Sequence, residues 1–314
     1  MAGSRRPLFA WSSDHFPVRL PLGHPFPMAK YAALRKRLLE DGVLAPDEIH
    51  HSEVAPLDWI LRVHDPDYVE RAVAGKLDEE EVRRLGFPWS SAMVDRARAA
   101  VYGTVMAAAA ALEQGVAGNL AGGTHHAFRD HGEGYCMFND LAVAIAVLRS
   151  EGAAKRPFIV DLDVHQGNGT AALFVEDPSV FTFSAHGVGN YPARKEQSTI
   201  DIELPDGCED ADYLDTVERF LPRALAEHGP DLVLYQAGVD ALAEDRLGRL
   251  SLTRDGLARR DDLVFRAIEE TGAPVVVTLG GGYAQPLEAT VEAHVNVWRA
   301  ARRARDRRQE RAVS

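Results

Sequence analysis

The sequence of 314 residues predicts an α/β protein built on an open, mostly parallel β-sheet with helices on both of its faces. From residue 158 onwards, short apolar runs alternate with longer segments of helical periodicity, as in a parallel sheet with crossover helices. The expected strands are 158–163, 180–184, 232–237 and 274–279, and the expected helices are 170–175, 212–227, 254–270 and 287–303. Polar residues follow each strand, at the edge where open parallel sheets bind ligands.

The first 150 residues fit the same architecture. The expected elements are an extended segment at 8–11, helices at 28–40, from Pro66, at 91–114 and at 140–150, and a short strand at 118–121. The segment 91–114 is rich in alanine, which predicts a long helix that packs closely against its neighbours. The acidic stretch 78–81 is expected on a solvated face.

The chain has no proline- or serine-rich linker and no internal repeat. We therefore expect a single domain over 1–314, with a core at about 8–300 and a basic tail at 301–314. Arginines crowd together in this tail, and we expect a solvated, fraying helix end there. They are Arg302, Arg303, Arg305, Arg307, Arg308 and Arg311.

The net charge and the number of cysteines limit the binding partners and the cellular compartment that we expect for this protein. The formal net charge of −12 argues against nucleic-acid binding and favours cationic partners such as lysine-bearing peptides or polyamines. Two cysteines, Cys136 and Cys208, cannot form a disulfide framework. No apolar run approaches the roughly 18 residues of a membrane span. We expect a cytoplasmic protein with no nucleic-acid or membrane partner.

The end of the expected strand 158–163 carries ligand-type side chains. Asp161, Asp163 and His165 share one face because side chains in a strand repeat every two residues. Carboxylate and imidazole ligands suit a borderline divalent metal such as zinc, and Asp240 is the best third ligand, which would leave a coordination position open. The alternatives are that Asp161 and Asp240 cap helices and that His165 is a hydrogen-bonded loop histidine.

Two adjacent histidines follow the strand at 118–121. His125 and His126 suit a proton-transfer pair beside a metal-activated water, with Asp161 and Asn168 as partners that fix their tautomers. Tyr283 comes after three glycines and is placed to donate its hydroxyl to an oxyanion. Alternatively, the histidines are buried hydrogen-bonding residues and Tyr283 belongs to the core.

Several motifs, in order from about residue 24 to residue 300, resemble the zinc-dependent histone deacetylase family. They are Gly-Gly-Thr-His-His-Ala at 122–127, Gly-Tyr-Cys-Met-Phe-Asn-Asp at 134–140, Asp-Leu-Asp-Val-His-Gln-Gly-Asn-Gly at 161–169, Gly-Val-Asp at 238–240 with Asp-Arg-Leu-Gly at 245–248, and Leu-Gly-Gly-Gly-Tyr at 279–283. The sequence of residues 161–169, with Asn168, resembles the class IV branch and its bacterial relatives more than class I.

The resemblance implies an arginase/deacetylase-like fold and assigns a role to each site residue. Zn²⁺, with Fe²⁺ as the alternative occupant, would be held by Asp163, His165 and Asp240. His126 would act as general base and then acid, His125 as its electrostatic partner bonded to Asp161, and Tyr283 would polarise the scissile carbonyl. The acyl-lysine stem would be held by the Gly134 carbonyl, by Tyr135 and Tyr191 as tunnel walls, and by Leu247 at the base. A structural K⁺ site would map onto Asp161, Asp163, His165 and Ser184.

Two positions depart from the class I pattern. Class I members have a second aspartate where this chain has Asn168, so we expect a lower pKa for His126 and a different pH optimum. The segment 79–91 offers no counterpart to the rim aspartate that grips the peptide backbone, which argues against histone-like peptide recognition.

We therefore expect a metal-dependent amidohydrolase that removes an acetyl or longer acyl group from the ε-nitrogen of lysine in a protein or peptide. The nearest alternative is an acetylpolyamine amidohydrolase that acts on a small acylated amine. A binuclear ureohydrolase would need further bridging carboxylates near Asn168 and Asp240. An inactive acyl-lysine reader or scaffold is the alternative outside the enzymes.

Overall fold

The computed structural model describes the backbone of residues 6–313 and the side chains of residues 6–310. Residues 1–5 and 314, which belong to the expected domain 1–314, lie outside this description, as does the Arg311 side chain. The described strands form one eight-stranded sheet in the order β2-β1-β3-β8-β7-β4-β5-β6. All neighbouring strands pair in parallel, which confirms the predicted sheet.

The strands are short, as the sequence predicts. They are β1 (Ala10–Ser12), β2 (Ile49–His51), β3 (Val116–Asn119), β4 (Pro157–Asp161), β5 (Phe181–Gly187), β6 (Ile200–Leu204), β7 (Leu232–Gln236) and β8 (Val275–Thr278). The two edge strands of the sheet, β2 and β6, were not predicted from the sequence. The strand before the histidines was predicted two residues too late, and β5 was predicted to end too early, so Ser184 and His186 lie within that strand.

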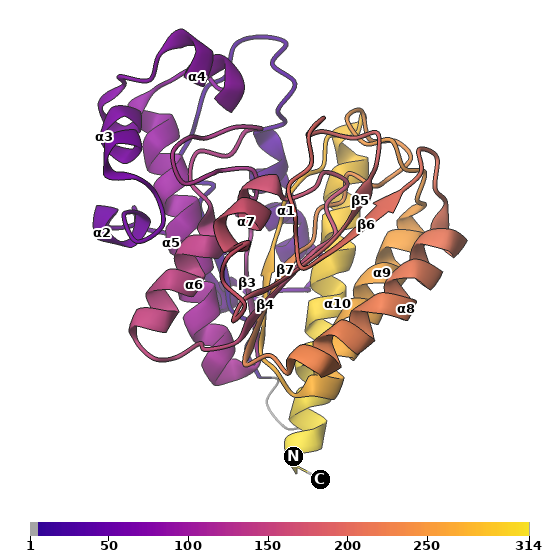
Figure 1. The fold of residues 1–314 in the computed structure, drawn as a ribbon. Coiled ribbons are helices and arrows are strands. Elements are labelled where there is room, and N and C mark those ends of the chain that lie inside the picture. Colours follow the sequence, from indigo (N-terminus) through magenta and orange to yellow (C-terminus); the bar gives the residue numbers. More distant parts are fainter. Residues whose placement is uncertain (1–5, 314) are drawn as a thin grey trace.

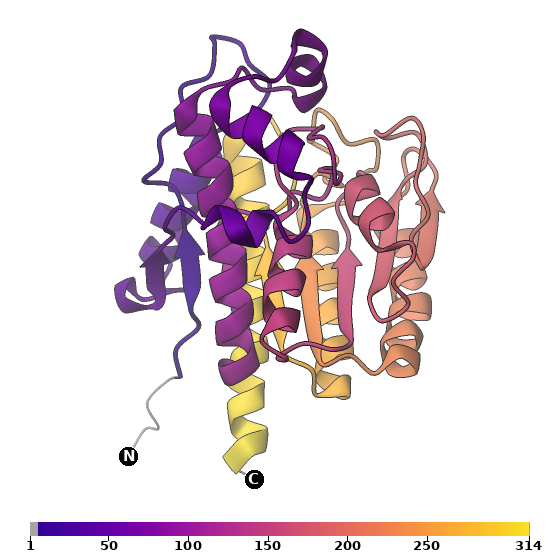
Figure 2. The same cartoon turned by 60° about the vertical axis from the view of Figure 1, so that its left-hand side comes forward.

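Helices cover both faces of the sheet (Figures 1 and 2). One layer contains α1 (Ala29–Glu40), α8 (Asp210–His228), α9 (Arg254–Thr271) and α10 (Leu287–Val313). The other contains α2 (Leu57–Ile60), α3 (Pro66–Ala74), α5 (Ser91–Gln114), α6 (Asp140–Ser150) and α7 (Asn168–Phe174). A short 3-10 helix, Pro46–Glu48, precedes β2.

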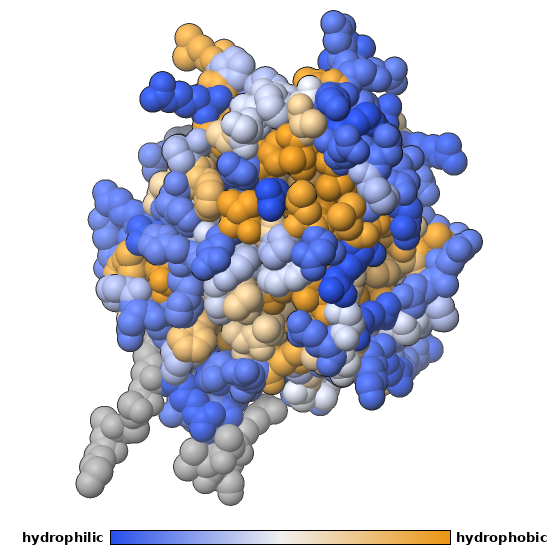
Figure 3. All heavy atoms as spheres, turned by 90° about the vertical axis from the view of Figure 1, so that its left-hand side faces the viewer, coloured by the Kyte–Doolittle hydropathy of each residue, from blue (hydrophilic) through white to orange (hydrophobic). Residues whose placement is uncertain are grey.

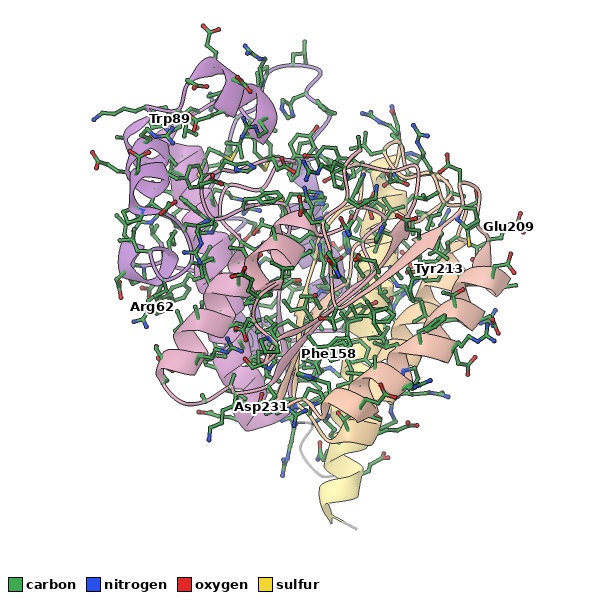
Figure 4. The ribbon with its side chains drawn as sticks, viewed as in Figure 1. Arg62, Trp89, Phe158, Glu209, Tyr213 and Asp231 are labelled. Carbon is green, nitrogen blue, oxygen red and sulfur yellow. The ribbon has the colours of Figure 1, made fainter. Side chains whose placement is uncertain are left out.

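The pleat of the strands divides the core into two parts. In β4, Phe158 and Val160 pack into the core that includes residues of α8, α9 and α10, whereas Ile159 packs into the core that includes residues of α5 and α6. Tyr213 of α8 belongs to the same core as Phe158, and Figure 4 labels both. Because both faces of β4 are buried, its sequence is a continuous apolar run without polar alternation.

Helix α4 (Glu79–Leu85) occupies the acidic stretch that the sequence analysis placed on a solvated face. The Asp78 side chain accepts hydrogen bonds from the backbone N–H groups of Glu80 and Glu81, so it acts as the N-cap. Gly86 ends the helix with φ +79°, a left-handed conformation that favours glycine. Glu79 and Glu80 are exposed, as expected.

The expectation of a solvated, fraying helix end is wrong for Arg302 and Arg305. Both residues belong to α10, and their side chains are buried. Arg302 donates to the Glu48 carboxylate at 2.5 Å, and Arg305 donates to the Pro7 carbonyl at 3.0 Å and to Gln114 Oε1 at 2.8 Å. The last turns of α10 therefore fasten the N-terminal segment to the rest of the protein. Sequence reasoning missed this because it treated a cluster of like charges as solvated.

Among the described residues, no helix combines the length and the apolar character needed to cross a membrane. The face that carries α2 and α3 has hydrophilic side chains around its periphery and apolar side chains gathered nearer its middle (Figure 3). Leu61 and Trp89 are exposed large apolar residues of this part of the chain.

We predict that Arg302→Ala lowers the free energy of unfolding by about 3 kcal/mol, because it leaves the buried Glu48 carboxylate without its charged partner. Arg303→Ala is the matched control, since Arg303 pairs with Asp262 at the surface, and we expect a loss below about 1 kcal/mol. Denaturant titration followed by circular dichroism measures both. Equal losses for the two variants would contradict the role assigned to Arg302.

Candidate metal centre and active site

The candidate site residues follow four strands that lie side by side in the middle of the sheet, in the order β3-β8-β7-β4. His125 and His126 come after β3, Tyr283 after β8, Asp240 after β7, and Asp163 with His165 after β4. This convergence agrees with the expectation from the sequence, because parallel strands end at a common edge. In Figure 1 the loops after the strands gather at the upper end, whereas α10 projects from the lower end.

The three proposed metal ligands lie together and are buried. Asp163, His165 and Asp240 each offer a ligand atom within 4.8 Å of the others. His165 Nδ1 lies 3.0 Å from Asp163 Oδ1 and 3.0 Å from Asp240 Oδ2. This is the only such group of three or more ligand-type side chains in the part of the chain that the structure describes.

The electrostatics of this cluster favour a cation. Burial and the neighbouring Asp163 charge raise the pKa of Asp240 to about 7. Burial lowers the pKa of His165, but Asp240 and Asp163 outweigh it and raise this pKa to about 10. Without a metal, the two carboxylates hold a proton on the imidazole between them. A divalent cation would take the place of that proton, so the donor set fits a metal of the zinc type.

Backbone groups hold the two carboxylates in place. Gly281 N–H donates to Asp163 Oδ2 at 2.7 Å, and Val164 N–H donates to Asp240 Oδ1 at 2.9 Å. A Cβ atom at residue 281 would lie 1.9 Å from Asp240 Oδ2, so the close approach requires glycine there. These contacts leave the facing oxygens, Asp163 Oδ1 and Asp240 Oδ2, directed at His165.

The structure does not support the helix-cap alternatives. Residue 167 is the N-cap of α7, and Thr253, which accepts a hydrogen bond from Gly256 N–H, is the N-cap of α9. Asp161 and Asp240 therefore cap neither helix.

Arg260 is a fully buried side chain of α9 that the sequence analysis did not single out. Its Nη1 donates to the Gly238 carbonyl at 2.6 Å and to the Leu162 carbonyl at 3.2 Å, and Asp261 balances its charge. Leu162 precedes Asp163, and Gly238 lies two residues before Asp240. One guanidinium thus links the segments that carry both carboxylate ligands.

The two histidines have different partners. His125 Nδ1 lies 2.7 Å from Asp161 Oδ2, and His126 Nδ1 lies 2.7 Å from Asn168 Oδ1, as the sequence analysis expected. Asn168 Nδ2 donates to Glu133 Oε1 at 2.5 Å. Because a carboxylate only accepts, Glu133 fixes the amide of Asn168 with its oxygen toward His126. His126 Nδ1 must then carry the proton, which leaves Nε2 free to act as a base.

The pKa values of the two histidines are shifted in opposite directions. Burial lowers the pKa of His125, but Asp161 and Asp163 outweigh it and raise this pKa to about 9. The pKa of His126 lies well below its ordinary value, chiefly because of burial and then because of the charges of His125 and His165. The pair therefore combines a charged imidazole with a neutral one, the usual division between an electrostatic partner and a base.

Glu133 is a site residue that the sequence analysis missed. Besides Asn168, it interacts with Tyr191, and its Oε2 lies 3.7 Å from His131 Nε2. The signal in the sequence was an acidic residue directly before the motif at 134–140. The sequence did not reveal it because the direction of a loop side chain does not follow from a helix or strand period.

A cavity of about 380 Å³ leads from the surface to His126 and His165. All four predicted tunnel residues line it, namely Gly134, Tyr135, Tyr191 and Leu247. Tyr283 lines the same cavity, and burial together with Asp240 and Asp163 raises the pKa of its hydroxyl well above the ordinary value. Tyr283 therefore keeps its proton and can donate a hydrogen bond.

Of the four residues mapped to a K⁺ site, Asp161 and Ser184 lie in adjacent strands, and Asp163 and His165 lie in the loop after β4. Asp161 of β4 pairs in register with Ser184 of β5. Asp161 Oδ1 accepts from Asp163 N–H at 3.2 Å, and Ser184 Oγ lies 2.9 Å from His186 Nδ1.

Comparison with known proteins places these residues in a family context. A family model described as the Histone deacetylase domain matches residues 24–298. An uncharacterised protein of Picosynechococcus sp. is 46% identical over 283 residues, covering 90% of this chain and 94% of that protein. Histone deacetylase 2 of Arabidopsis thaliana is 33% identical over 270 residues, covering 83% of this chain and 70% of that protein. The structure of a histone deacetylase homologue complexed with SAHA superposes with a TM-score of 0.79 at 25% identity, covering 95% of this chain and 84% of that chain.

We predict that Asp240→Asn weakens Zn²⁺ binding at least about 100-fold, since even the partners of metal ligands contribute about 10–100-fold. Calorimetric titration of the metal-free protein with Zn²⁺ measures the affinity. Glu133→Gln is the matched control, because Glu133 contacts Asn168 but none of the three ligands, and its affinity should stay close to the unmodified value. Similar Zn²⁺ affinities for Asp240→Asn and the unmodified chain would contradict this assignment of the site.

Proposed function

Because this chain belongs to the histone deacetylase family and has its arginase/deacetylase-like fold, we propose that it is a metal-dependent lysine deacylase. Its substrate would be an N-ε-acyl-lysine, acetyl or longer, in a protein or peptide. The observation that carries the proposal is the meeting of Asp163, His165 and Asp240 beside a neutral His126, at the inner end of a cavity with aromatic walls. Hydrolysis of such an amide releases a carboxylate and the free lysine amine.

Asp163, His165 and Asp240 would hold the metal, Zn²⁺ or alternatively Fe²⁺. When bound there, such a cation supplies Lewis acidity for the substrate carbonyl and lowers the pKa of water. Three protein ligands are the usual number where a coordination position stays open for catalysis.

The side chains around the three metal ligands take different parts in the proposed reaction. His126 Nε2 accepts the proton of the attacking water and later returns it to the leaving lysine nitrogen. His125 is held by Asp161 and stabilises the charge of the reacting groups. Tyr283 donates its hydroxyl to the oxygen of the scissile carbonyl as negative charge develops there. His125, His126, Asp161, Asn168 and Tyr283 are thus the proposed catalytic group.

The cavity walls suit the lysine stem. Tyr135 and Tyr191 present aromatic surface to a chain of methylene groups, with the Gly134 carbonyl as an acceptor and Leu247 as a further apolar contact. Tyr135 has φ +67°, a strained value for a residue other than glycine, which is consistent with a functional position.

The alternative functions receive less support. A binuclear ureohydrolase needs a second set of carboxylates, whereas the described residues contain one metal-type group and Asn168 is engaged by His126 and Glu133. An inactive reader would not need a neutral imidazole beside the metal ligands. The class IV relationship, the K⁺ site at Asp161, Asp163, His165 and Ser184, the single domain and the cytoplasmic location stay predictions.

We predict that Tyr283→Phe lowers kcat on an acyl-lysine peptide about 100-fold or more, because it removes one donor to the developing oxyanion. Tyr102→Phe is the control, since Tyr102 stacks on Trp59 away from the cavity. A series of peptides from acetyl to long-chain acyl, assayed with Zn²⁺-loaded protein, measures both variants. Absence of turnover on every peptide, or unchanged kcat in Tyr283→Phe, would overturn the proposed function.

We predict that Glu133→Gln lowers kcat about tenfold, because the amide of Asn168 is no longer held toward His126 by a charge. The double variant Glu133→Gln with Asn168→Asp places a carboxylate directly beside His126, and we expect it to recover most of the loss. A double-mutant cycle on kcat measures this coupling. Additive losses in the double variant would show that Glu133 does not act through residue 168.

A further inference from the structure

We propose that the mouth of the cavity is a cationic docking surface that selects acyl-lysines flanked by aspartate or glutamate, so that the preferred substrate is an acidic peptide. This inference rests on the proposed deacylase function and adds to it a preference for negatively charged peptide substrates. It also runs against the expectation from the net charge of −12, which favoured cationic partners.

Arginines approach the mouth from two sides. Arg83 and Arg84, in the last turn of α4, line the cavity on one side, and Arg249, in the loop between β7 and α9, lines it on the other. Their side chains are 70%, 36% and 58% exposed. Among the residues that the structure describes, no aspartate or glutamate lines the same cavity. An extended peptide whose acyl-lysine enters the cavity would therefore place its neighbouring residues near guanidinium groups.

The acids that accompany these arginines lie outside the cavity lining. Arg83 pairs with Glu79 at 3.7 Å, Arg84 with Glu80 at 3.3 Å, and Arg249 with Asp206 at 3.2 Å. All three pairs are substantially exposed, and exposed ion pairs contribute only about 0–1 kcal/mol each. A substrate carboxylate can therefore compete for the guanidinium groups, which bind carboxylates in a bidentate manner.

Two further cations lie on the segments around the mouth. Lys195 donates to the carbonyls of Asn190 and Pro192, on either side of Tyr191. Arg246 is next to Leu247 and donates to Gln285. Two carboxylates that adjoin the cavity lining in the sequence are engaged elsewhere, since Asp245 accepts from three backbone N–H groups and Glu133 accepts from Asn168. The charged side chains that line the mouth are thus arginines, on a protein whose net charge is negative.

This arrangement argues against polyamines. An acetylated polyamine carries its remaining ammonium groups into the mouth, where the arginines would repel them. A peptide with acidic residues beside the acyl-lysine would instead be attracted before it binds, which raises the association rate and makes it depend on ionic strength.

The test compares three acetyl-lysine peptides that differ only in the two residues on each side of the lysine, which are glutamate, glutamine or lysine, together with acetylputrescine. We measure kcat/KM with the Zn²⁺-loaded protein at low salt and at about 1 M salt. We expect the acidic peptide to exceed the basic peptide at least about tenfold at low salt. The difference should largely disappear at about 1 M salt, where the Debye length is about 3 Å.

The variant Arg249→Glu should reverse or abolish this preference. Arg223→Glu is the matched control, because Arg223 is also an exposed arginine paired with a carboxylate, lies on α8, and changes the net charge equally. It should leave the acidic-to-basic ratio unchanged. Equal rates on the three peptides, a preference for the basic peptide, or equal effects of the two variants would overturn the inference while leaving the deacylase function intact. A preference for acetylputrescine over all three peptides would overturn the inference and favour an acetylpolyamine amidohydrolase over the proposed function. Absence of turnover on all the peptides would instead count against the proposed function.

Discussion

The arrangement of the rest of this structure depends on two buried carboxylates that face each other. Asp163 and Asp240 belong to loops after neighbouring strands, and their ligand atoms lie within 4.8 Å of each other and of His165. Two like charges at that distance repel by about 3 kcal/mol at an effective dielectric constant of about 20. The surrounding protein stabilises this arrangement through backbone N–H groups, a required glycine at 281 and the buried Arg260, and a cation would complete it.

The same constraint explains the protonation of the histidines. Negative charge at Asp161 and Asp163 raises the pKa of His125, whereas burial and then the charge of His125 lower the pKa of His126. Glu133 then selects the tautomer of His126 through Asn168. Because Asn168 lies between Glu133 and His126, the Glu133 carboxylate orients the His126 imidazole without placing a full negative charge beside it. His125, Asn168 and Glu133 together thus keep His126 neutral and set its tautomer.

Part of the centre could be predicted from sequence because parallel strands end at one edge of a sheet, which brings the residues after β4 and β7 together. The expected strand 158–163 was too long, since β4 ends at Asp161, so Asp163 and His165 lie in the loop after it and not on one face of the strand. Features that depend on loop direction did not follow, such as Glu133 and the arginines at the cavity mouth. The edge strand β2 was missed because it has only three residues, and β6 was missed because apolar and acidic residues alternate in it instead of forming a continuous apolar run. The buried arginines of α10 were missed because charge usually indicates exposure.

The position of α10 has a practical consequence. Its C-terminal turns are held by Glu48, Pro7 and Gln114 at the end of the sheet opposite the loops that follow the strands and carry the site residues (Figure 1). A fluorophore, bead or fused protein attached beyond this helix would point away from the entrance. The molecule can therefore be immobilised by that end with its opening facing free solution.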